Sequence, residues 1–231
     1  MIIETPTCGI GGGGDLAPGS LLRLLAWLSP AFPTGAFACS HGLEWAVEAG
    51  DISDANTLRD WLTDILLHGS GRSDAILLRH AHRAARDPAT LDGIVELAAA
   101  IAPARERLAE TIGQGTAFLR AARVWGGPQL PQQIPYPVAV GAIAGWHGVS
   151  EDATAAAYIQ AFAANLISAA VRLVPLGQTD GLRVLAALEP AVLNLADETR
   201  DTTLDAIGGC AFRSDLAAMR HETQYTRLFR S

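Results

Sequence analysis

The stretch Cys39-Ser40-His41 is the place where residue types could support nucleophilic catalysis. It sets a hydroxyl next to an imidazole, the pairing by which hydrolases activate a nucleophile. Neighbouring residues on a helix point about 100° apart, so Ser40 and His41 are poorly placed for proton transfer. Glu44 and Glu48 are an acid–base candidate at i and i+4, but carboxylates at this spacing commonly form a solvated face. A hydrolase at Ser40 and His41 is therefore an alternative only, and we do not expect an enzyme.

Metal and nucleotide chemistry also find little support. His80 and His82 are the one close histidine pair, and positions i and i+2 lie on different sides of a helix. We expect the six histidines to be solvated, and we expect no metal or cofactor. All seventeen basic residues are arginine, so neither a usual Walker A loop nor a lysine Schiff base can form. Three widely spaced cysteines predict a reducing, cytoplasmic compartment.

Charge divides the chain into a body and a tail. The net charge is −7, which argues against nucleic-acid binding. The sequence contains no run of about 18 uncharged apolar residues, so we expect no membrane-spanning helix. Residues 213–231 carry a net +2, against −9 for the rest. Arginine and aromatic residues dominate interface hot spots, so the tail either docks on its own body or binds a partner. The candidate partner-binding residues are Arg220, His221, Glu222, Tyr225, Arg227, Leu228, Phe229 and Arg230.

The elements that must position these residues are helices. Apolar residues recur at helical spacing, and no alternating β-branched run appears, which predicts an all-α single domain of about nine or ten helices. We expect a flexible leader at 1–19, a helical domain at 20–212 that includes a loop at 126–135, and the C-terminal segment 213–231. Within the domain we expect helices at 37–49, 182–188 and 191–207, and capping of other helices by Ser53 or Asp54 and by Ser150.

A bend joins two of the expected helices. Residues 159–174 are apolar on all sides, which predicts a helix buried among others. Val174-Pro175 and Gly177 then force a turn. Arg172, Gly177 and Gln178 lie at this bend, as internal struts or as the face of a binding site.

Three stretches, in order along the chain, resemble the UreF family of urease accessory proteins. One is 24–50, one is 168–189 with Pro-Leu-Gly-Gln at 175–178, and one is 219–231 with Arg-His-Glu at 220–222 and Arg-Leu-Phe-Arg-Ser at its end. Cys39 stands where relatives often have tyrosine. The first stretch matches the family signature through Ser29, Pro30, Pro33, Gly35, Phe37, Ser40, Gly42, Leu43 and Glu44.

The resemblance implies an all-α scaffold that is not itself an enzyme. Such proteins dimerise, bind the accessory protein UreD (also called UreH), and recruit the GTPase UreG, so that nickel is inserted into apo-urease. The tail is then expected to bind UreD, while the bend is structural or contacts UreG, and alanine-rich helices supply the dimer seam. A helical adaptor unrelated to urease is the second alternative.

Overall fold

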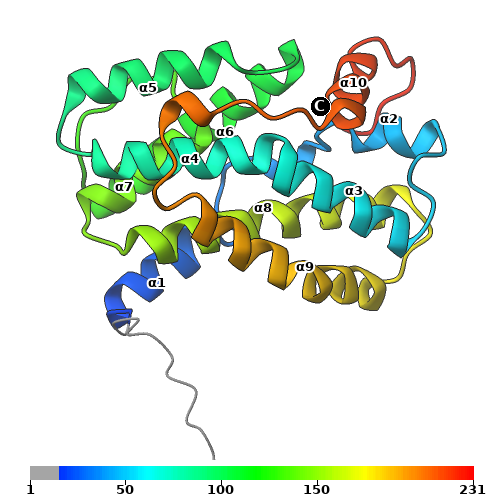
Figure 1. Ribbon diagram of the computed structural model, residues 1–231, viewed down its shortest axis with the longest axis horizontal. Coiled ribbons are helices and arrows are strands. Elements are labelled where there is room, and N and C mark those ends of the chain that lie inside the picture. Colours follow the sequence, from blue (N-terminus) through cyan, green and yellow to red (C-terminus); the bar gives the residue numbers. More distant parts are fainter. Residues whose placement is uncertain (1–15) are drawn as a thin grey trace, which may run out of the picture.

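Helices make up all the regular structure of residues 16–231, the part of the chain that the computed structural model describes. These residues form ten α-helices and three short 3-10 helices, with no strand among them, so the all-α prediction is confirmed. Figure 1 shows α3 and α4 through the middle of the molecule, with α8 and α9 along one side, α5 along the other, and α2 and α10 together at one end. The α-helices are α1 (Pro18–Trp27), α2 (Leu43–Glu48), α3 (Ala55–His68), α4 (Ser70–Arg83), α5 (Pro88–Ala100), α6 (Arg105–Ala122), α7 (Tyr136–Trp146), α8 (Glu151–Leu173), α9 (Gln178–Glu198) and α10 (Phe212–His221). The 3-10 helices are η1 (Ala36–Ala38), η2 (Arg123–Trp125) and η3 (Leu204–Ala206).

The central helix α4 packs most closely against α7. Gly141 and Gly145 lie one turn apart on α7, facing α4. A β-carbon at Gly141 would lie 2.1 Å from the carbonyl oxygen of Leu78, and one at Gly145 would lie 2.2 Å from that of His82. Only residues without a side chain allow the two backbones to approach so closely.

Two groups of buried apolar side chains form the core. One joins α2, α3, α8 and α9 and includes Leu62, Leu166 and Leu195. The other joins α1, α4, α5, α6 and α7 around Trp27 and Phe118. Each large side chain that is fully buried contributes about 1.5–3 kcal/mol. The helices on both sides of segment 126–135 contribute to the second group, which keeps this loop inside one body.

Two helix starts follow the expected capping chemistry. The Asp54 carboxylate accepts from the backbone N–H groups of Asn56 and Thr57, and Thr57 bonds back to the Asp54 N–H. Ser150 accepts from the N–H of Ala153 at the start of α8. A short oxygen side chain at this position satisfies N–H groups that lack a helical partner.

The expected helix at 37–49 is wrong. The chain forms η1, then an irregular segment in which His41 has φ 61° and Gly42 has φ 79°, and α2 begins only at Leu43. A left-handed backbone cannot continue a right-handed helix. As shown below, this irregular segment binds the C-terminal tail.

The expected break at Pro190 is also wrong, because α9 runs through it. The proline is on the solvent side of α9, while Val184, Leu188, Val192 and Leu195 form one buried stripe that crosses it. This stripe packs on α3 and α8, and tertiary packing outweighs the hydrogen bond that proline cannot make. Of the expected leader at 1–19, residues 1–15 lie outside the described part, and α1 begins at Pro18.

Among the described residues, α8 is the one helix long and apolar enough to cross a membrane by length and composition. Half of its most apolar window is buried inside the protein. Buried positions such as Ala155, Ala163 and Ala169 face neighbouring helices, which agrees with the predicted packed core helix.

Candidate partner-binding site

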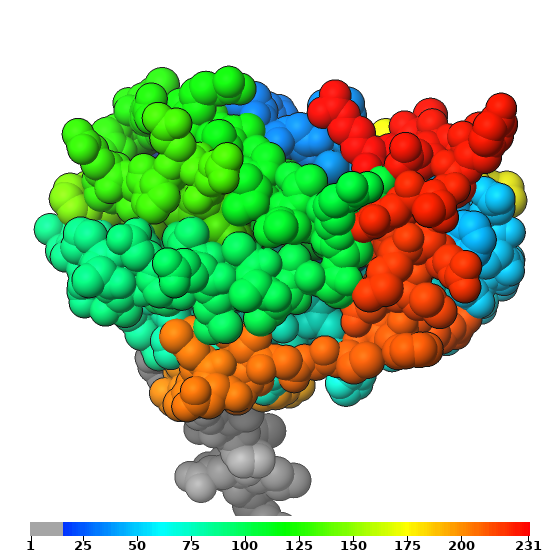
Figure 2. Space-filling view, turned by 90° about the horizontal axis from the view of Figure 1, so that it is seen from above, coloured from blue at the N-terminus to red at the C-terminus, as the bar shows by residue number. Residues whose placement is uncertain are grey.

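The C-terminal segment lies on the surface at one end of the molecule, where Figure 2 shows it in red. Helix α10 packs against α2 and α6, and residues 222–231 then return across the irregular segment before α2. Gly42 makes the close approach possible, since a β-carbon there would lie 2.7 Å from the backbone nitrogen of Ala218. The glycine of the family-like signature is thus required by its positive φ and by this contact.

Glu44 holds the tail. Its carboxylate is buried and accepts hydrogen bonds from the backbone N–H groups of Leu228 at 2.6 Å and Phe229 at 2.9 Å. The ring nitrogen Nε2 of His221 lies 3.2 Å from the same carboxylate. Two backbone donors and a neighbouring imidazole nitrogen on one buried carboxylate make a strong anchor, because hydrogen bonds to a charged acceptor are stronger than neutral ones. Glu44 is therefore a structural clamp and not part of a solvated face.

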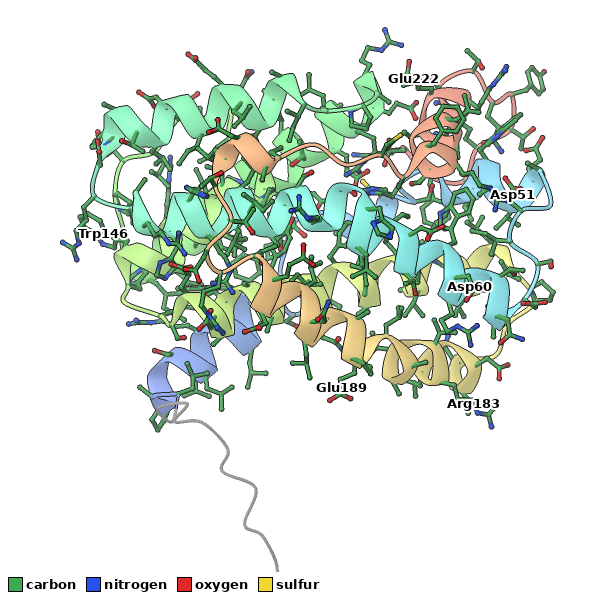
Figure 3. The ribbon with its side chains drawn as sticks, in the orientation of Figure 1. Asp51, Asp60, Trp146, Arg183, Glu189 and Glu222 are labelled. Carbon is green, nitrogen blue, oxygen red and sulfur yellow. The ribbon has the colours of Figure 1, made fainter. Side chains whose placement is uncertain are left out.

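Glu106 on α6 provides the second anchor. His221 is fully buried, and its Nδ1 lies 2.6 Å from Glu106. Arg227 donates to the same carboxylate at 2.6 Å. Glu222, labelled in Figure 3 at the end of α10, accepts from the backbone N–H of Arg105 at 2.8 Å. These contacts join the tail to the start of α6.

The last residues are held equally tightly. Phe229 is 4% exposed, and the guanidinium of Arg172 stacks on its ring at 4.4 Å. The backbone N–H of Arg230 donates to Ala38, and both the N–H and the hydroxyl of Ser40 donate to the carbonyl of Ser231, at 2.6 and 2.5 Å. The chain therefore folds its own tail into the signature segment.

Another part of the segment faces solvent. Phe212, Leu216 and Met219 lie at i, i+4 and i+7 on the outer side of α10, and all three are exposed. Tyr225 is fully exposed, and Leu228 is 68% exposed. Arginines 213, 220, 227 and 230 of the same segment are also exposed. We call Phe212, Leu216, Met219, Arg220, Tyr225 and Leu228 the outer face.

The predicted site residues divide into two sets. His221 and Phe229 are internal, and Glu222 and Arg227 bond to the body, whereas Arg220, Tyr225 and Leu228 belong to the outer face. The sequence reading did not assign Phe212, Leu216, Glu44 or Glu106 to this site. Helical spacing from Met219 is the signal that would have found the first two. Glu44 belongs to the family-like signature, but nothing local connects it or Glu106 to the tail.

The three residues predicted at the bend also fall into two sets, one that contacts the tail and one that is exposed. Arg172 belongs to the tail site, since it also donates to the carbonyl of Phe37 at 2.7 Å. Gly177 and Gln178 are exposed at the start of α9.

The Ser40 and His41 side chains do not form a catalytic pair. Ser40 is buried and bonded to Ser231, while Nε2 of His41 lies 2.7 Å from the Ser70 hydroxyl. Burial lowers the pKa of His41 to about 4, and it raises the pKa of the Cys39 thiol. The geometry thus gives no support to a hydrolase at this pair.

The expectation of solvated histidines is wrong for His41 and His221, which are buried because carboxylate and hydroxyl partners replace water. His80 and His82 are half-buried and bond to different carbonyls, those of Thr202 and Val149. Within residues 16–231, no group of three or more His, Cys, Asp or Glu residues could hold a metal ion.

Comparisons with known proteins agree on one family. The UreF family model matches residues 52–189, more than half of the chain. The urease accessory protein UreF of Rhodopseudomonas palustris strain BisB5 is 54% identical over 222 residues, which cover 92% of this chain and 91% of that protein. UreF of Methylorubrum populi is 54% identical over 91% of this chain and 98% of its own, and UreF of Mesorhizobium japonicum is 51% identical over 92% and 96%. The chain therefore belongs to the UreF family of urease accessory proteins.

Proposed function

We propose that this chain is a non-catalytic scaffold that, with UreD (UreH) and the GTPase UreG, enables nickel insertion into apo-urease in the cytoplasm. One observation carries the proposal: the three stretches that resemble the family meet at the tail site. Glu44 of the first stretch and Arg172 of the second both contact Phe229 of the third, and Arg172 also donates to Phe37 of the first. Residues far apart in sequence thus serve one structure, the docked C-terminal segment.

The docked segment supports binding of UreD through its outer face. The inner contacts fix the backbone before any partner arrives, which lowers the ordering cost of association. The apolar stripe of α10 is the kind of helix surface that enters a hydrophobic groove, and the exposed arginines of the segment suit an acidic rim. UreD is expected to supply both.

We propose that the dimer seam lies along α8. Ala157, Ala161 and Ala164 are half-buried, and Ser168 is exposed, so this side of the helix lets another backbone come close. An apolar groove of about 190 Å³ adjoins it, lined in part by Phe32, exposed Phe37, Ala161 and Ala164. UreG is left with other exposed surface, of which the bend at Gly177 and Gln178 is our candidate.

The decisive experiment is co-expression with UreD, followed by size exclusion with light scattering. The variant Leu216→Asp, Met219→Asp removes the apolar stripe at two exposed positions, so it is expected to fold and to lose the complex. Arg220→Ala is expected to weaken the complex without affecting stability. Arg227 is left intact, because its ion pair with Glu106 would make a binding loss ambiguous.

Leu193→Asp is the matched control, since Leu193 is comparably exposed but lies on α9. It is expected to bind UreD normally. A complex that survives the double substitution would show that the outer face is not the interface. A folded wild-type chain that forms no complex with UreD would overturn the proposed function itself.

A further inference from the structure

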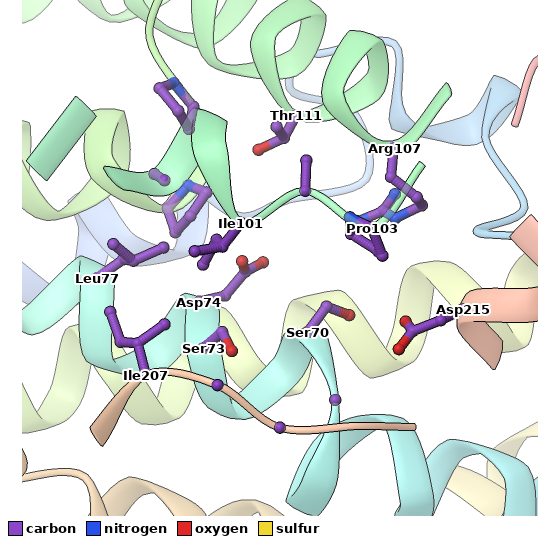
Figure 4. A pocket seen from close by; sticks show the side chains of 17 residues that line it. Ser70, Ser73, Asp74, Leu77, Ile101, Pro103, Arg107, Thr111, Ile207 and Asp215 are labelled. Carbon is purple, nitrogen blue, oxygen red and sulfur yellow. The ribbon is translucent and has the colours of Figure 1, made fainter. Parts of the chain in front are cut away.

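A small cavity lies between α4, α6 and segment 207–209, and the interactions with UreD proposed above do not use it. Its volume is about 100 Å³. Figure 4 shows Ser70, Ser73, Asp74, Arg107 and Thr111 around it, with Asp215 at one side. The cavity therefore has room for several water molecules or for one small molecule.

Arg107 is the unusual residue of this cavity. It is 7% exposed, yet neither its Nε nor its Nη1 makes a hydrogen bond to another described residue. Its Nη1 forms an ion pair with the carboxylate of Glu110. A buried N–H without a partner is destabilising, so a ligand that accepts a hydrogen bond from it is favoured.

The start of α4 points to the same kind of ligand. This 14-residue helix begins at Ser70, and Gly69 before it supplies no side-chain cap. The first N–H groups of a helix carry partial positive charge and bind anions when no side chain satisfies them. Gly69, Ser70 and Arg107 all line the cavity, so the start of α4 and the buried guanidinium both border it.

We propose that this cavity binds a small planar oxyanion of the carboxylate or bicarbonate class, held by Arg107 and the start of α4. A planar group with two oxygens matches the fork of a guanidinium.

The carboxyl groups of Asp74 and Asp215, which line the cavity, modify its affinity for an anion. Asp74 faces Tyr158 from α8, which donates to it at 2.8 Å, and Arg107 and Glu110 from α6. Burial raises the pKa of Asp74 to about 6, and burial also raises the pKa of Asp215. An anion repels ionised Asp74 and accepts a hydrogen bond from the protonated form. Binding therefore takes up a proton, and the affinity rises by about tenfold for each pH unit as the pH falls toward 6.

The test uses formate as the probe and the full chain labelled with nitrogen-15. The Nε–H resonance of Arg107 is followed by NMR during titration at pH 7.5 and 6.0, and Arg107→Lys assigns it by its disappearance. Arg120→Lys, at an exposed position on the same helix, is the matched control for that substitution. We expect a saturable shift of the Arg107 resonance and a tighter dissociation constant at the lower pH.

Asp74→Asn supplies the second arm, and Asp64→Asn at an exposed position is its control. Asp74→Asn is expected to bind formate at pH 7.5 at least tenfold more tightly than wild type and to lose the pH dependence. A linear shift equal to that caused by chloride would overturn the proposal, as would identical titrations of wild type and Asp74→Asn. If Arg107→Lys fails to fold, this comparison of wild type with Asp74→Asn decides alone.

Discussion

The buried carboxylate of Glu44 gives the sharpest test of how the tail is held. Glu44→Gln keeps one acceptor oxygen but replaces the other by an NH₂ group that faces N–H donors. Of the two backbone donors at 2.6 and 2.9 Å, at least one then loses its acceptor, and the negative charge 3.2 Å from His221 Nε2 disappears. Hydrogen bonds to charged groups contribute about 1.5–3 kcal/mol each, so we expect the docked tail to lose about 2–4 kcal/mol.

Hydrogen exchange measures this loss where it occurs. The tail can open without global unfolding, so exchange of the amides of residues 228 and 229 reports its local stability. A loss of about 2–4 kcal/mol corresponds to exchange faster by about 30- to 800-fold, since each 1.4 kcal/mol is a factor of ten. Glu189→Gln, at an exposed position on α9, is the control and is expected to change exchange little. Protection that stays within about threefold of wild type in Glu44→Gln would refute the clamp.

Two further predictions concern stability. Gly42→Ala is expected to lower the free energy of unfolding in urea by about 1–3 kcal/mol from its positive φ alone, with an added clash against α10. Gly50→Ala has a similar φ and open space, so equal losses at both positions would exclude the contact with α10. Asp74→Asn is expected to stabilise the protein at pH 7.5 by up to about 3 kcal/mol, because a carboxyl whose pKa is raised to about 6 loses stability as pH rises from about 4 to 6. At pH 4 the gain should vanish, and an equal gain at both pH values, measured by urea unfolding, would contradict this origin.

The helices could be predicted from the sequence where their starts depend on nearby residues. Asp54 and Ser150 cap the helices predicted for them, because a cap depends on residues two or three positions away. The helix break predicted at Pro190 is wrong because a contact outside the local sequence outweighs the local preference. The local preference of proline breaks a helix, but the buried stripe of α9 on α3 and α8 decides the outcome.

The candidate partner-binding site could be predicted from the sequence only in part. The opposite charge of the tail and its arginines and aromatics marked the segment, and the outer face retains Arg220, Tyr225 and Leu228 from that reading. The reading could not separate residues that hold the tail down from residues left outside. Phe229 and Leu228 are neighbours in sequence, yet one is buried and the other is exposed.

The sequence by itself determined the all-α class, the helix starts with local caps, the charged tail and the family signature, because these depend on residue types and on spacing along one helix. The tertiary structure alone decided what Glu44, His221 and Arg172 do. Glu44 meets the tail backbone across 184 and 185 positions, and His221 meets Glu106 across 115. Such contacts arise from the packing of α2, α6 and α10 against one another, and no periodicity within a single helix encodes them.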